Sequence, residues 1–229
     1  MEEGMTSTSV SSILPQPRSK PLRAGSKKED AIRRYLDERI LQISRKYAKK
    51  FQPAEENRVG DIKGYDSMEE VAGDLEGLAN IVWLSATPSL QTQYLLSIAG
   101  ILINYVTAFP PVPSATFALL KKMDHTFSSL LNGKDLLTGE VLPGFLGKMN
   151  SGFSKTDMVR LKGLVEETRI LIVNLMKNMK PEEKDDTDPQ LEKSFDFLED
   201  SDMDVARVYE HTIIQLGSLL ELDNFSQGL

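Results

Sequence analysis

The segment Trp83-Leu-Ser-Ala-Thr-Pro-Ser-Leu-Gln91 opens the part of the chain that decides the fold. An apolar run over 94–105 follows it, then the proline corner Phe109-Pro-Pro-Val-Pro113 and, further on, Leu142-Pro-Gly-Phe145. Proline cannot continue a helix and glycine often ends one, so these residues mark the ends of elements. Apolar residues recur between them at helical spacing. We therefore predict a central helix over 88–106, a second from Pro113 or Ser114 to Asn132, and a loop pinned to the core by Leu142 and Phe145.

The flanking segments repeat the helical spacing. Between 29 and 51 the apolar positions are three or four residues apart, as in one stripe of a helix. Ser67 and Ser154 stand where a helix N-cap is expected, which predicts helices from 67 to about 87 and from 154 to about 179. A last helix is predicted over 202–222. Because no run alternates with period two between turn signals, we predict an all-α protein: a single bundle of about six helices.

Composition narrows the possible chemistry. The 229 residues include no cysteine and only His125 and His211, which excludes disulfides and thiolate metal sites. We expect no metal and no cofactor. The longest apolar stretch, over 95–106, is too short for a membrane span of roughly 20 residues. Residues 1–5 also lack the pattern of a secretory signal, so we expect a soluble protein that does not bind a membrane.

Charge is distributed unevenly along the chain. Residues 1–50 hold 12 Lys/Arg and 6 Asp/Glu, a balance of 12 − 6 = +6, whereas residues 182–202 hold 2 Lys and 10 Asp/Glu, a balance of 2 − 10 = −8. These parts either pair with each other, bind different partners or are solvated. Phe195, Phe197 and Leu198 lie within the acidic part, which is read as a linker or as a transient docking segment.

These observations divide the chain into three parts. Residues 1–28 are predicted to be a disordered tail, 29–222 a helical domain that includes an acidic linker over about 181–201, and 223–229 a C-terminal tail. The tail carries the cations of either a nuclear-import signal or a solubilising segment: Arg18, Lys20, Arg23, Lys27 and Lys28. The basic helix over 29–51 either packs with its lysines solvated or binds nucleic acid.

No catalytic constellation is recognisable. The nearest echo of a phosphate-binding loop, Asn132-Gly-Lys-Asp135, lacks the earlier glycine and the hydroxyl. Asp124 and His125 are adjacent in a helix and point about 100° apart, so Asp124 cannot orient His125 as in a hydrolase, and we expect a surface or interface histidine. Glu166 and Glu167 are expected to pair with Lys162, Arg169 or another helix. We predict that the protein is not an enzyme.

Several motifs together resemble the fungal family of subunit 11 of the general transcription factor TFIIH. The resemblance covers about residues 35–215 and rests on Gly64-Tyr65, Trp83–Gln91, Tyr94-Leu-Leu-Ser97, Ala108-Phe-Pro110, Leu119–His125, Phe127–Leu131, Thr138-Gly-Glu140, Leu142–Phe145, Val159-Arg160, Leu164–Arg169 and Val208-Tyr-Glu210. Ala86 stands where the family pattern has glycine, and Met123 where leucine is commoner.

The resemblance implies a non-enzymatic nuclear subunit that acts in transcription and DNA repair by promoting release of the XPB-type translocase from TFIIH. We expect its partners to be TFIIH subunits, chiefly that translocase. The alternative is a helical adaptor that associates with nucleic acid through the basic first helix. We expect the partner surface to include polar and proline residues that interrupt the apolar core, unless these merely cap and redirect helices: Ser85, Thr87, Pro88, Ser89, Gln91, Phe109, Pro110, Pro111 and Pro113.

Overall fold

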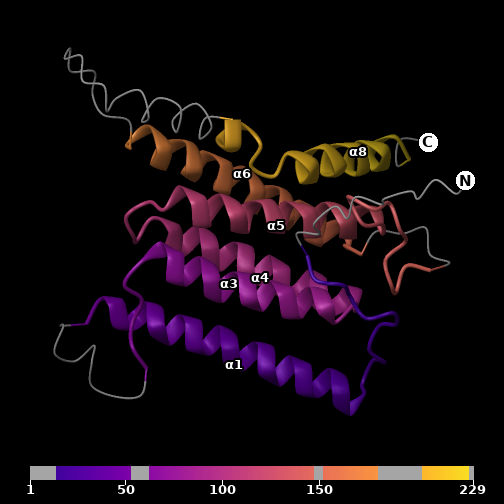
Figure 1. The fold of residues 1–229 in the computed structure, drawn as a ribbon. Helices are drawn as coiled ribbons and strands as arrows, with labels where there is room; N and C mark the ends of the chain where they lie inside the picture. Colours follow the sequence, from indigo (N-terminus) through magenta and orange to yellow (C-terminus); the bar gives the residue numbers. More distant parts are fainter. Residues whose placement is uncertain (1–13, 53–61, 147–151, 180–202, 227–229) are drawn as a thin grey trace, which may run out of the picture.

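Stacked helices make up the protein, as shown by a computed structural model that describes residues 14–52, 62–146, 152–179 and 203–226 (Figure 1). The helices are α1 (Lys27–Lys50), α3 (Met68–Leu84), α4 (Pro88–Val106), α5 (Pro113–Asn132), α6 (Lys155–Lys177) and α8 (Glu210–Ser226). Among the described residues there is no strand, only an isolated bridge between Lys134 and Val141. The predicted all-α bundle is confirmed.

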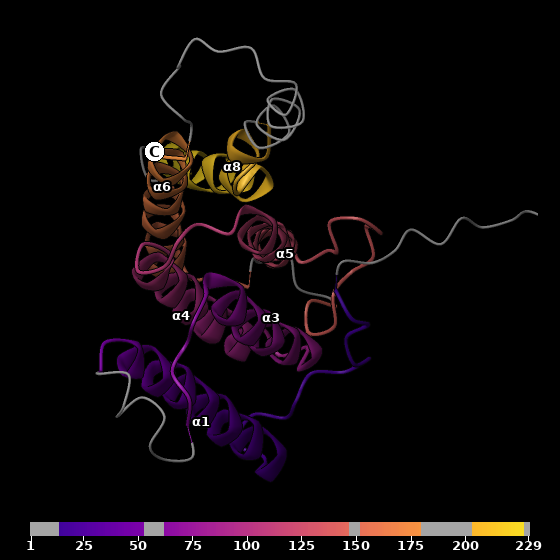
Figure 2. The same cartoon turned by 60° about the vertical axis from the view of Figure 1, so that its left-hand side comes forward.

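The helices lie in layers. α1 covers the outside of α3 and α4, α5 packs on the far side of α3, and α6 and α8 close the opposite face (Figures 1 and 2). α4 lies at the centre, and its buried residues occupy most of its circumference, as its apolar sequence predicts. In the parts of the chain that are described, no helix has both the length and the apolar character that crossing a membrane requires.

Three helices begin at serine caps. The hydroxyl oxygens of Ser26, Ser67 and Ser154 accept hydrogen bonds from the backbone N–H three residues on, at 3.2, 3.3 and 3.2 Å. Such a cap stabilises a helix by about 1 kcal/mol because it satisfies an N–H that has no partner within the helix. The predicted starts at Ser67 and Ser154 are confirmed.

Gly133 ends α5 and makes room for the loop that follows. Its φ of 67° lies in the left-handed region, and a Cβ there would lie 2.8 Å from Cδ1 of Phe145. Phe145 and Leu142 are buried, as predicted. Glycine therefore allows the loop over 133–146 to fold back against the bundle.

Residues 14–26 differ from the expectation of a disordered tail. They form an irregular segment, here called the strap, that runs along the end of the bundle to the start of α1 (Figure 1). Leu14 and Leu22 are buried, and Nε1 of Trp83 donates to the Pro15 carbonyl at 3.1 Å. Two buried leucines and backbone hydrogen bonds to α3 hold the strap in place. Residues 1–13 and the acidic linker lie outside the described residues, so the domain boundaries as a whole stay a prediction.

The predicted single helix over 202–222 is interrupted. One helical turn spans 203–206, and α8 starts after a break at 207–209, where Tyr209 has a φ of 55°. Arg169 of α6 donates to the Val208 carbonyl at 2.6 Å, so the break is stabilised from a neighbouring helix. α8 then continues to Ser226, past the predicted end at Leu222.

Candidate interaction surfaces

The residues predicted to form one partner surface lie at opposite ends of α4. The Ser85–Gln91 turn precedes this helix and the proline corner follows it. α4 has 19 residues, so its two ends are about 27 Å apart at 1.5 Å per residue. The structure therefore separates the predicted surface into two parts.

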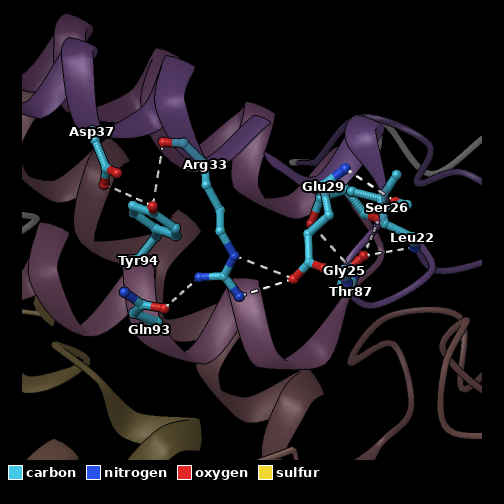
Figure 3. A network of polar contacts seen from close by, with 10 residues as sticks. Leu22, Gly25, Ser26, Glu29, Arg33, Asp37, Thr87, Gln93 and Tyr94 are labelled. Atoms are coloured by element: carbon cyan, nitrogen blue, oxygen red, sulfur yellow. Dashed lines mark hydrogen bonds and ion pairs between the residues drawn. The ribbon is translucent and has the colours of Figure 1, made fainter. Parts of the chain in front are cut away.

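Most of the Ser85–Gln91 turn faces inward. Ser85, Thr87 and Gln91 are buried, Pro88 is half-buried, and Ser89 is exposed. Although Thr87 is the residue before α4, its side chain makes no capping bond. The Thr87 hydroxyl instead donates to the Ser85 carbonyl at 2.8 Å and accepts from the backbone N–H of Leu22 at 2.9 Å (Figure 3).

Two further hydrogen bonds close the same turn. The Ser85 hydroxyl donates to the Val82 carbonyl at 2.7 Å, and Nε2 of Gln91 donates to the Trp83 carbonyl at 3.1 Å. Burying polar side chains is costly unless they are paired, and here they pair with backbone carbonyls at the end of α3. These residues hold the turn and the strap together.

The proline corner is anchored by Phe109. Its ring is buried, stands edge-on to Tyr65 at a centroid distance of 6.4 Å, and lies 4.7 Å from the Lys50 ammonium. Pro111 and Pro113 are half-buried, and Pro110 is exposed. Pro113 begins α5, where its missing N–H costs nothing. As an interface the predicted set stays a prediction, and its exposed members are Ser89 and Pro110.

A polar network joins α1 to α4 (Figure 3). Arg33 donates to Glu29 at 2.9 Å and, through Nη1, to Oε1 of Gln93 at 3.0 Å. The Arg33 bond and the backbone N–H of Gly25 hold the pKa of Glu29 below its usual value. The Tyr94 hydroxyl donates to Asp37 at 2.7 Å, and burial together with this bond raises its pKa to about 12.

Asp74 of α3 holds the other half of α1. Its carboxylate accepts from Lys46 at 2.7 Å, from the Tyr65 hydroxyl at 2.8 Å and from Arg39 at 3.4 Å. Burial raises the pKa of Asp74, but Lys46, Tyr65 and Arg39 outweigh it and leave the pKa below its usual value. Burial and Asp74 raise the pKa of Tyr65. An open pocket of about 550 Å³ lies beside this cluster, and Glu70 also lines it.

His125 is buried, so the expectation of a surface or interface histidine is wrong. Its side chain is 2% exposed, its Nε2 lies 2.9 Å from Oδ2 of Asp135, and its ring stands edge-on to Trp83. Burial raises the pKa of Asp135, but the bond to His125 and the N–H groups of Thr138 and Leu137 outweigh it and lower the pKa. The sequence could not reveal that the loop after α5 folds over this face.

Asp124 faces a different element from His125, as the helix geometry predicts. Its Oδ1 accepts from the backbone N–H of Thr212 at 2.8 Å and from the Thr212 hydroxyl at 2.6 Å, and its Oδ2 lies 2.8 Å from Nδ1 of His211. Asp124 thus caps α8, a role that its sequence neighbours do not suggest.

The remaining polar groups of the described residues are mostly bound within the fold. The Ser129 hydroxyl accepts from the Leu136 N–H, and the buried Ser128 hydroxyl has no hydrogen-bond partner in the part of the chain that the structure describes. Glu166 pairs with Lys162 at 3.8 Å, as expected. Among the described residues no group of three His, Asp or Glu side chains is placed to hold a metal ion.

Comparison with known proteins identifies related sequences. A family model described as "Subunit 11 of the general transcription factor TFIIH" matches residues 64–217, from the segment before α3 into α8. An uncharacterised protein of Schizosaccharomyces pombe is 28% identical over 157 residues, which cover 67% of this chain and 83% of that protein.

A second relative carries a functional name. The general transcription and DNA repair factor IIH subunit TFB6 of Saccharomyces cerevisiae is 27% identical over 210 residues, covering 72% of this chain and 59% of that protein. This chain therefore matches little more than half of the length of that subunit. No solved structure matches.

Proposed function

Because the chain belongs to the family of subunit 11 of the general transcription factor TFIIH, we propose that it is a non-enzymatic accessory subunit that promotes release of the XPB-type DNA translocase. The family is one of transcription-factor subunits, and the Saccharomyces cerevisiae relative is named as a subunit of the transcription and DNA repair factor. We propose three things of this chain: that the translocase is its partner, that it does not catalyse a reaction, and that it is nuclear. Since TFIIH acts on nuclear genes, we place the protein in the nucleus.

The observation that carries the proposal is the family match over residues 64–217. It takes in α3, α4, α5 and α6 with the loops between them, which form most of the described core. The polar clusters at Asp74, Asp124 and Asp135 support the same conclusion, because each one joins parts of the fold. Contacts with other proteins are then the means by which such a bundle acts.

Release is a matter of differential affinity. An accessory subunit shifts the equilibrium toward free translocase if it binds the free form better than the form held in the complex. Ser89 and Pro110 lie at opposite ends of α4, so a partner that contacts both must extend along about 27 Å of the bundle. Interfaces of the usual size, about 800 Å² per partner, reach that far.

Affinity purification of the tagged full chain from nuclei tests the partner. We expect the XPB-type translocase among the bound proteins. A release assay then tests the action: immobilised TFIIH is washed with the purified chain, and the translocase left on the matrix is measured. Recovery of no TFIIH subunit, together with unchanged retention of the translocase, would overturn the proposal.

Matched variants locate the surface. Ser89→Glu and Pro110→Glu change exposed residues at the two ends of α4, whereas Val159→Glu places the same charge on the outer face of α6. If the predicted surface is used, release weakens with at least one of the first two variants and not with the third. If all three variants release the translocase equally well, the predicted surface is not used, although the translocase can still be the partner.

The alternative, binding of nucleic acid by the basic first helix, has less support. Arg33, Arg39 and Lys46 form ion pairs with Glu29 and Asp74, so part of the positive charge of α1 serves contacts within the bundle. Arg45→Glu removes an exposed cation of that helix. If α1 binds duplex DNA, this variant lowers the affinity and reduces its dependence on salt.

A further inference from the structure

Three segments meet at the end of the bundle where α3 turns into α4. The backbone N–H of Arg18 in the strap donates to the Leu84 carbonyl at 3.5 Å, close to the bond between Leu22 and Thr87. From the other side, a Cβ on Gly144 would lie 2.9 Å from Cδ of Pro88. The loop over 133–146 and the strap therefore pack on the same turn, and they lie side by side in both views (Figures 1 and 2).

This end of the bundle exposes large apolar side chains. Leu84, Leu137, Val141 and Leu146 are 39%, 49%, 45% and 73% exposed. Two backbone hydrogen bonds hold the loop in this conformation: the Asp135 N–H donates to the Glu140 carbonyl at 2.8 Å, and the Leu142 N–H donates to the Gly133 carbonyl at 2.9 Å. The loop therefore does not turn these side chains inward. Exposed apolar side chains on a loop held by its own backbone hydrogen bonds, with Leu84 of α3 at the same end, are typical of an interaction site.

The strap adds a row of positive charge beside these side chains. The strap and the first residues of α1 hold five exposed cations, and no acidic residue occurs between residues 14 and 28: Arg18, Lys20, Arg23, Lys27 and Lys28. Within the described residues none of the five makes an ion pair, and the N-terminus of α1 adds its own positive end. The nearby acids are Glu29, which is bonded to Arg33 and Gly25, and the exposed Asp30 and Glu140.

We propose that this apolar and basic end binds an acidic segment of a partner protein that carries leucine or phenylalanine side chains. The apolar side chains find burial against such a segment, and the strap complements its charge. Nucleic acid fits less well, because a phosphate backbone leaves the leucines exposed and the only tryptophan, Trp83, is buried. The inference concerns the kind of segment that is bound and stands independently of the translocase proposal.

A synthetic peptide tests the inference on the full-length chain. The probe contains three Asp-Phe-Glu-Leu repeats, and a control peptide with three Asp-Ser-Glu-Ser repeats has the same charge without the apolar side chains. We expect the first peptide to bind about tenfold more tightly than the second by fluorescence anisotropy at low salt. Raising the salt should weaken both.

Paired variants assign the binding to this surface. Leu137→Ser with Leu146→Ser, and separately Arg18→Glu with Arg23→Glu, should each weaken binding of the first peptide about tenfold. The controls are Val159→Ser with Ile170→Ser on α6 and Arg45→Glu with Arg160→Glu, which match the number of apolar and charged side chains changed, at exposed sites elsewhere. The controls should bind as the unmodified chain does.

Four outcomes would overturn the inference. If the first peptide does not bind measurably, the surface does not bind such a segment. If both peptides bind equally, the apolar side chains do not contribute to binding. A DNA duplex or anionic lipid vesicles could bind more tightly than the first peptide. If the arginine variant abolishes that binding and the leucine variant keeps it, the strap binds phosphate groups instead. Finally, Phe195, Phe197 and Leu198 can be changed to serine. If this change strengthens peptide binding about tenfold, the acidic segment of this chain itself occupies the surface and competes with the peptide.

Discussion

The carboxylate of Asp124 on α5 caps α8 through Thr212, 88 positions further along the chain. One oxygen accepts both the backbone N–H and the hydroxyl of Thr212, and the other accepts the backbone N–H of His211 at 3.3 Å. A carboxylate at a helix N-terminus also interacts favourably with the helix dipole. The start of the C-terminal helix is thus determined by a residue of the central bundle.

Asp124→Ala should therefore loosen α8. Thr212 is fully buried, so losing the cap leaves its N–H without a partner and its hydroxyl with only the Asp124 backbone carbonyl, at 3.3 Å, and we expect about 3 kcal/mol less free energy of unfolding in urea. Asp204→Ala is the matched control: it removes a carboxylate in the helical turn over 203–206, where Asp204 pairs with the exposed Lys121 of α5. That variant should change stability by about 0.5 kcal/mol or less. Equal losses for the two would contradict the capping role.

Thr87→Val should release the strap. Valine has the shape of threonine but leaves the N–H of Leu22 without its acceptor, so we expect a loss of about 2 kcal/mol and earlier proteolysis within residues 14–26. Thr87→Ser keeps the hydroxyl and should retain most of the protection. If valine and serine variants are cleaved alike, the hydroxyl does not hold the strap.

Local signals allowed much of the fold to be predicted. A cap is set by a serine and the next three residues, so Ser67 and Ser154 could be read correctly. The strap could not, because Leu14 and Leu22 are isolated among prolines and basic residues and their partners are more than sixty positions away. Periodicity likewise missed the break before α8, which depends on Arg169 of another helix.

The candidate surface was predictable only in part. Prolines and polar residues within an apolar stretch mark turns, but the sequence does not show whether such a turn is covered. Here the strap and Gly144 cover the Ser85–Gln91 turn from two sides. His125 was misjudged for the same reason, because Asp135 reaches it through a loop that the helical pattern does not describe.

Ala86 should tolerate glycine and reject branched side chains. It has a φ of 50° and is buried, which gives a physical reason for glycine at this position in the family pattern. Ala86→Gly relieves the left-handed strain but loses a methyl group and adds chain entropy, so we expect a change within about 1 kcal/mol. Ala86→Val should cost about 2 kcal/mol or more, measured by urea unfolding. A valine variant as stable as the glycine variant would contradict the left-handed conformation.

Acid should weaken the contact between α1 and α3 through Asp74. Its pKa is lowered in the folded chain, so the unfolded chain takes up the proton at a higher pH. The carboxylate therefore adds stability above about pH 4, and this contribution is lost as the pH falls through the folded pKa. Asp74→Asn should be less stable than the unmodified chain at pH 7, with a smaller difference near pH 3.

The control for this prediction is Asp66→Asn. Asp66 is mostly exposed and pairs with the exposed Lys63, so its removal should leave stability nearly unchanged at both pH values. A difference for Asp74→Asn that stays constant from pH 7 to pH 3 would mean that the carboxylate is not the group that titrates in this contact.

Removing the Tyr209 hydroxyl should stabilise the protein. The side chain is 1% exposed, its hydroxyl oxygen has no hydrogen-bond partner among the described residues, and burial beside Asp124 raises its pKa. An unpaired buried hydroxyl is costly, so Tyr209→Phe should raise the free energy of unfolding by about 1 kcal/mol. Tyr94→Phe is the contrasting variant, because it removes a hydroxyl bonded to Asp37 and should lower stability by about 1 kcal/mol. Loss of stability in both variants would contradict an unpaired Tyr209 hydroxyl, because removal of an unpaired group should not cost what removal of the bonded Tyr94 hydroxyl costs.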